Sequence, residues 1–198
     1  DPLADLELTR GIEERLSARG DTIRPLEETL ARESIRELLD AGVESITISL
    51  MHSYADPTHE QRLKAMIQDM GGDIPVSLSS ELLPEFREYE RTLVTVMNAY
   101  VRPSMGRYLK GFEEKLRSIQ FSPKVNIVRS DGGLMSVAKA SESPVHTMLS
   151  GPAGGVSGAA YLATLAGYPN ALGFDMGGTS TDGSLIQDGA PTQSRQTQ

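Results

Sequence analysis

Between residues 26 and 78 the spacing of apolar residues alternates between helical and extended, and this alternation restricts the fold more than any other feature. A helical period over residues 26–39, closed by Gly42, is followed over residues 43–50 by apolar residues alternating with small hydroxyl residues. A second helix is expected to begin at Asp56-Pro57, and a second strand covers residues 74–78. Helix, strand, helix, strand at this spacing predicts an α/β fold with parallel strand pairing.

Helices are predicted on both sides of this block. Leu6, Ile12 and Leu16 stand at near-helical spacing, which predicts a helix over residues 2–19. Residues 89–119 also repeat apolar side chains with a helical period, and Pro103 should either divide this segment into two helices or bend it. The run at residues 79–91, rich in Glu and Arg, is interpreted as a solvated face whose ion pairs each contribute little, part of which could meet a partner or substrate.

Glycine and hydroxyl residues dominate the chain after residue 120. A short strand over residues 124–129 is followed by the turn Ser130-Asp-Gly-Gly133, in which Asp131 is either a candidate site residue or a structural turn residue. A helix of small residues follows over 153–166 and includes Gly154 and Gly155. Because glycine costs up to about 1 kcal/mol relative to alanine in a helix, we expect a ligand or another backbone to approach this helix closely.

A hairpin is predicted over residues 171–186. An apolar run ends at Asp175, the pair Gly177-Gly178 and three hydroxyl residues follow, and a strand pattern resumes after Asp182. Glycine N–H groups and hydroxyls can approach phosphate oxygens, and carboxylates can hold a hydrated divalent ion. The tip is therefore either a phosphate and metal site or an ordinary surface turn.

Composition excludes several other classes of protein. The formal net charge of −8 argues against nucleic acid and anionic membranes as partners, and no apolar run has the length of a membrane helix. The absence of cysteine excludes disulfides and thiolate metal sites and is typical of a cytoplasmic protein. The chain contains no P-loop, no GxGxxG, no HExxH and no Gly-x-Ser-x-Gly motif.

The hairpin and several other stretches resemble a known family. The segment Phe174–Asp182 resembles a phosphate hairpin of the actin, sugar kinase and chaperone superfamily. Between about residues 43 and 190 the chain resembles one family more specifically. This is the hydantoinase A/5-oxoprolinase family, which includes acetone and acetophenone carboxylase subunits. The residues that carry this closer resemblance are Ser53–Glu60, Ser79–Arg91, Asn98–Pro103, Ser130–Met135 and Leu149–Gly155.

This resemblance implies a fragment of a two-lobed actin-like ATPase fold with RNase H-like lobes. Residues 1–88 would end the first lobe and residues 89–198 would begin the second, so the chain would be internal to a longer subunit. Two positions depart from the pattern, since Asp131 stands where Asn is frequent and Gly183 stands where a β-branched residue is usual.

The resemblance also implies site residues and cofactors. ATP phosphate would be held at the tip and at the small-residue helix, and Asp175 and Asp182 would hold Mg²⁺ or another divalent cation. Asp175 and Asp131 are the candidate catalytic residues. The residues assigned to phosphate contact are Gly177, Gly178, Thr179, Ser180, Thr181, Gly154 and Gly155.

Three functions follow as alternatives. The first is ATP-dependent hydrolysis of a cyclic amide or imide, such as a hydantoin or 5-oxoproline, through phosphorylation of the ring carbonyl oxygen. The second is the ATP-using subunit of an acetone or acetophenone carboxylase. The third is a scaffold or subunit-contact piece without activity. A hydantoinase B-like subunit or domain and an oligomer are the expected partners.

Overall fold

The computed structural model describes residues 4–71, 73–121, 124–178 and 180–192. They form two compact units, residues 1–113 and 114–198, and the boundary falls inside the long helix α4 (Glu88–Ser118). This helix continues through Pro103, so the alternative of two separate helices was wrong. None of the helices in these ranges has the length and apolar character needed to cross a bilayer.

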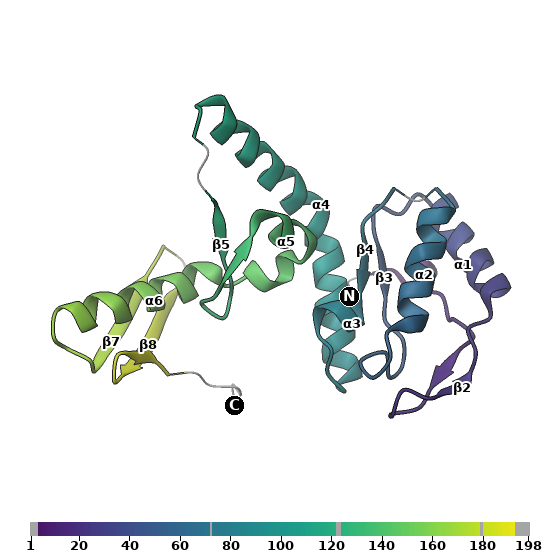
Figure 1. The fold of residues 1–198 in the computed structure, drawn as a ribbon, viewed down its shortest axis with the longest axis horizontal. Helices are drawn as coiled ribbons and strands as arrows, with labels where there is room; N and C mark the ends of the chain where they lie inside the picture. The colour runs from purple at the N-terminus through teal and green to yellow at the C-terminus, as the bar shows by residue number, and fades with distance from the viewer. Residues whose placement is uncertain (1–3, 72, 122–123, 179, 193–198) are drawn as a thin grey trace. The chain divides into compact units, whose positions relative to one another are not determined.

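The first unit is built on a parallel pair of strands. Strand β3 (Ile46–Ile48) pairs with β4 (Val76–Leu78), which confirms the predicted parallel pairing, although both strands are shorter than predicted. Helices α1 (Glu28–Asp40) and α2 (Thr58–Asp69) lie on one side of this pair and α4 on the other (Figure 1). The short helix α3 (Ser79–Leu82) follows β4 directly.

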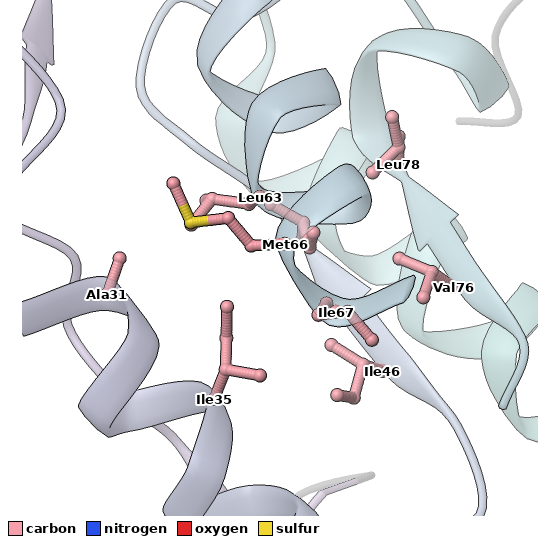
Figure 2. Packing of buried hydrophobic residues seen from close by; sticks show 9 residues of the cluster. Ala31, Ile35, Ile46, Leu63, Met66, Ile67, Val76 and Leu78 are labelled. Atoms are coloured by element: carbon pink, nitrogen blue, oxygen red, sulfur yellow. The ribbon is translucent and has the colours of Figure 1, made fainter. Parts of the chain in front are cut away.

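The apolar core of the first unit lies between the strands and the first two helices. Figure 2 shows side chains of α2 between those of α1 and those of the strands. Alternation places Ile46 and Ile48 in this core, and on the opposite face Asn98 of α4 donates to Ser77 at 3.0 Å. The core residues are Ala31, Ile35, Ile46, Ile48, Leu63, Met66, Ile67, Val76 and Leu78.

The predicted helix over residues 2–19 is wrong. The structure has a short 3-10 helix, η1 (Leu6–Leu8), and then an antiparallel hairpin of β1 (Arg15–Leu16) and β2 (Thr22–Arg24). Residues 11–16 alternate between exposed and more buried positions, which is a strand period. The period is hidden in the sequence because one inward position is Glu14, which is buried against the His59 ring at 2.8 Å.

A buried polar cluster lies at the carboxyl ends of β3 and β4. The Glu60 side chain is fully buried and accepts hydrogen bonds from the Leu50 N–H and the Ser79 hydroxyl on one oxygen. Its other oxygen accepts from the backbone N–H and the hydroxyl of Ser80. Four donors from two segments therefore satisfy one carboxylate, which ties α2 to the ends of both strands.

Arg91 completes this cluster from the first turn of α4. Its guanidinium is fully buried and donates to Ser53, to Ser79 at 3.1 Å and to the Leu50 carbonyl at 2.9 Å, and it pairs with Glu88. The interpretation of residues 79–91 as a solvated face is thus wrong for Arg91. It is right for Arg87, whose side chain is 55% exposed.

The second unit contains two hairpins that contact one helix. The first hairpin is formed by β5 (Asn126–Val128) and β6 (Leu134–Ser136), followed by α5 (Val137–Glu142) and η2 (Pro144–Thr147). Helix α6 (Ser150–Leu165) comes next, and β7 (Ala171–Met176), β8 (Thr181–Gln187) and β9 (Ala190–Pro191) form an antiparallel sheet (Figure 1). The predicted small-residue helix and the second hairpin are both confirmed.

Candidate functional site

The tip of the β7–β8 hairpin joins two carboxylate-bearing strands. Asp175 is the direct cross-strand partner of Asp182, and Met176 is the partner of Thr181. The Gly177 N–H donates to the Ser180 carbonyl at 2.9 Å and closes the tip. Gly178 is exposed with open space around it, and Thr179 lies outside the described residues. The backbone at Gly178 is therefore open to a ligand, whereas the Gly177 N–H assigned to phosphate contact is already bonded within the hairpin.

Asp175 and Asp182 are opposite each other across the hairpin, and within the described ranges neither carboxylate forms an ion pair with a Lys, Arg or His side chain. Direct cross-strand partners project from the same face with Cβ atoms about 4.5–5.5 Å apart, and like charges there repel. Among the described residues no three His, Cys, Asp or Glu side chains gather as a complete metal site. Two carboxylates with water and phosphate oxygens are a usual donor set for Mg²⁺. The pair fits such an ion chemically.

Helix α6 presents bare backbone beside Asp175. A Cβ atom on Gly155 would lie 3.7 Å from Asp175 Oδ2, so the Asp175 face of β7 is turned toward the helix. Gly151 and Gly158 are exposed with nothing within 4 Å of a Cβ position. A Cβ atom on Gly154 would instead lie 3.7 Å from Val128 Cγ1 on β5. The structure thus brings Gly155, but not Gly154, to the carboxylate pair.

The Ser130–Gly133 turn lies against the start of α6. The Ser130 hydroxyl donates to the His146 carbonyl at 2.9 Å and accepts from the Leu149 N–H at 3.3 Å. A Cβ atom on Gly132 would lie 3.1 Å from the Ser157 hydroxyl oxygen. Both the turn and the second hairpin therefore contact the same helix.

Asp131 has a structural role in this turn. Its Oδ1 accepts from the Gly133 N–H at 2.9 Å, and its Oδ2 pairs with Arg129 Nη2 at 2.9 Å. The Gly133 N–H, with a contribution from the Arg129 charge, holds the pKa of Asp131 below its usual range. Asp131 is exposed and ionised, so a site role remains compatible with the turn role.

Sequence reasoning missed two cationic residues, Arg91 in the first unit and Arg129 in the second. Arg129 escaped notice because a lone Arg before a turn carries no spacing pattern, and Arg91 was hidden in a charged run. The only signal for Arg91 was its place at the start of a predicted helix that follows a strand. The buried guanidinium of Arg91 donates to the hydroxyl of Ser53, which is 38 positions away in the chain.

The glycines of the second unit differ in what an added methyl group would meet. Gly158→Ala is expected to stabilise the chain by about 0.5–1 kcal/mol, because alanine is the better helix former and the site is open. Gly189→Ala is expected to destabilise it by about 1 kcal/mol or more, because Gly189 has φ +78°. Thermal unfolding of both variants checks this. A less stable Gly158→Ala protein would mean that another surface occupies this face of α6.

Comparisons with known proteins agree with this architecture. The family model described as Hydantoinase/oxoprolinase matches residues 91–198, and the model of the Hydantoinase/oxoprolinase N-terminal region matches residues 1–71. The nucleotide-free structure of acetone carboxylase is 35% identical with a TM-score of 0.84, covering 97% of this chain and 27% of that chain. ATP-dependent caprolactamase from Pseudomonas jessenii is 34% identical with a TM-score of 0.82, covering 89% and 26%.

A plant relative extends the same similarity. The chain is 38% identical to 5-oxoprolinase 1 of Arabidopsis thaliana over 179 residues, which are 89% of this chain and 14% of that protein. The chain spans about a quarter or less of the length of the curated relatives that it matches. Its α/β class is confirmed, and its structure is compatible with part of an actin-like ATPase. Since the first of the two models covers more than half of the residues, the chain belongs to the hydantoinase/oxoprolinase family.

Proposed function

We propose that this chain carries one phosphate-binding half of an ATP-dependent enzyme that opens a cyclic amide or imide. The observation that carries the proposal is the facing pair Asp175 and Asp182 at a glycine tip, with the bare backbone of α6 at Gly155 beside it. The similarity to ATP-dependent caprolactamase and to 5-oxoprolinase supports this reaction class. Because the chain spans a quarter of those lengths or less, the activity would belong to a longer polypeptide.

Each group of residues has a defined task in this proposal. The N–H group of Gly178 and the hydroxyls of residues 179–181 would bind phosphate oxygens, with Gly177 shaping the tip through its bond to the Ser180 carbonyl, and Asp175 and Asp182 would hold a hydrated Mg²⁺. ATP would supply a phosphoryl group to the ring carbonyl oxygen, which makes the amide carbon open to attack by water. Asp131 would act on the substrate side from its turn. Residues 1–88 and 89–198 would belong to the first and second lobes.

A ketone carboxylase is the second candidate, because acetone carboxylase matches the chain at least as well as caprolactamase does. Subunits of acetophenone and acetone carboxylases are among the relatives, and so is the alpha subunit of caprolactamase. A multi-subunit enzyme with a hydantoinase B-like partner is therefore part of the proposal. Cytoplasmic location is proposed from the absence of cysteine.

A substrate screen separates the two reactions. The full-length protein with its partner subunit is incubated with ATP, Mg²⁺ and either hydantoin, 5-oxoproline, caprolactam, acetone or acetophenone, with and without bicarbonate. We expect ATP consumption that depends on a cyclic amide and not on bicarbonate. Turnover only with a ketone and bicarbonate would replace the amidohydrolase by the carboxylase. No substrate-dependent ATP consumption in any mixture would favour the scaffold alternative.

A further inference from the structure

A histidine in a left-handed conformation lies at the carboxyl end of the parallel strands of the first unit. His52 has φ +60° and follows β3 by four residues. This conformation costs a non-glycine residue about 1–2 kcal/mol, and such strain gathers at functional sites. In open α/β sheets, ligands commonly bind beyond the carboxyl ends of parallel strands.

The ring of His52 is held from one side by charged and aromatic neighbours. Its backbone N–H donates to Glu88 Oε1 at 3.3 Å, and its ring Nδ1 lies 3.8 Å from the same oxygen. The Tyr54 ring meets it edge-on, with centroids 5.9 Å apart and planes at 80°. The charged and titratable groups around this ring are thus Glu88, Tyr54 and, behind them, Arg91.

The neighbours of His52 are fixed by the buried cluster. Arg91 pairs with the second oxygen of Glu88, and its guanidinium carbon lies 5.7 Å from the centre of the Tyr54 ring. Because Arg91 is fully buried and bonded to Ser53 and Ser79, it holds both neighbours in place. Glu88 therefore stands as an oriented carboxylate beside a histidine ring.

Among the residues that the structure describes, one ring nitrogen of His52 makes no hydrogen bond. Its Nδ1 is buried and has no hydrogen-bond partner, and an unmade buried hydrogen bond costs about 1–3 kcal/mol. His59 provides the contrast, since its Nδ1 lies 2.8 Å from the buried Glu14 carboxylate, as expected of a structural histidine. The side chain of His52 is 29% exposed, so part of it can be reached by a ligand.

We propose that His52 is the proton-transfer residue of a small-molecule site at the carboxyl end of β3 and β4, with Glu88 as its positioning residue. The Glu88 carboxylate lies 3.8 Å from Nδ1, beyond hydrogen-bond distance, and a contact that tightens when the ligand binds would hold the proton on that nitrogen and leave Nε2 as the acceptor. The class of ligand, a small carbonyl compound, rests on the proposed function. In ring opening, an O–H bond of water breaks, the proton passes to Nε2 and the water oxygen bonds to the amide carbon. The C–N bond then breaks, Nε2 returns the proton to the ring nitrogen, and a second water hydrolyses the remaining acyl phosphate to carboxylate and inorganic phosphate.

Two measurements on the full-length protein with its partner subunit test this site. Carbethoxylation of histidines with diethylpyrocarbonate, mapped by mass spectrometry, is expected to label His52 and to be slowed by a carbonyl compound of the panel above. His52→Gln is expected to lower kcat at least about a hundredfold while the Kd for ATP changes less than twofold. Glu88→Gln should lower kcat about tenfold, and the double variant should be no worse than His52→Gln, because the two residues act as a unit.

Glu90→Gln is the matched control for Glu88→Gln, because Glu90 is an exposed neighbour on α4 and should leave kcat unchanged. The inference is overturned if no compound slows the labelling of His52, or if His52→Gln keeps more than half of the wild-type kcat. If Asp175→Asn keeps near wild-type turnover, the proposed function is refuted. The slowed labelling of His52 by a carbonyl compound would still show a ligand at this residue. The two failures are therefore distinguishable.

Discussion

Asp175→Asn is expected to lower the ATP-dependent turnover of the full-length protein by at least about a hundredfold, which corresponds to ~2.7 kcal/mol of transition-state stabilisation. The substitution preserves shape but removes the charge that would hold the divalent ion opposite Asp182. Phosphoryl transfer depends mainly on positioning and on neutralising phosphate charge, so loss of the ion affects the chemical step directly. Steady-state assays with ATP and the substrate found in the screen measure the effect, and higher Mg²⁺ should restore part of the rate.

Asp188→Asn is the control for this experiment. Asp188 lies in the turn after β8, at the other end of the strand from the tip, and its φ of +52° is one that asparagine tolerates well. Turnover of this variant should match that of the wild type. If Asp175→Asn also keeps near wild-type turnover while its circular dichroism is unchanged, the carboxylate pair does not hold a catalytic metal ion and the proposed function is lost.

Arg91→Met is expected to destabilise the first unit by about 3–5 kcal/mol, the usual cost of removing one partner from a buried ion pair. Methionine fills a similar length, but it leaves the Glu88 carboxylate, the Leu50 carbonyl and the hydroxyl of Ser53 without their shared donor. Urea unfolding followed by far-UV circular dichroism measures the change in the free energy of unfolding.

Arg87→Met separates burial from charge. Arg87 is one turn earlier on the same segment, its side chain is 55% exposed, and its nearest carboxylate oxygen, on Glu90, is 3.7 Å away. An exposed pair of this kind contributes at most about 1 kcal/mol, so the control should unfold close to the wild type. Equal stabilities of the Arg91→Met and Arg87→Met proteins would show that the cluster at the strand ends does not hold the first unit together.

The parts of the fold that were predicted correctly depend on local patterns. The parallel pair β3–β4 follows from alternating periods within 30 to 40 residues, and the β7–β8 hairpin follows from a glycine pair between two strand patterns. The predicted N-terminal helix failed because Glu14, directly before β1, occupies a buried position where its carboxylate contacts the His59 ring. A polar residue at such a position breaks the hydrophobic period on which the prediction relied.

In the candidate site, too, the features set by local patterns were predicted and those set by contacts between distant residues were not. The sequence alone determined that Asp175 and Asp182 flank a glycine turn, because strand register is set by the turn between them. Only the tertiary structure decided that Gly155 rather than Gly154 lies beside Asp175, that Arg91 is buried, and that His52 meets Glu88. These contacts join residues 20 to 40 positions apart, and packing between elements, which no local pattern encodes, sets their distances.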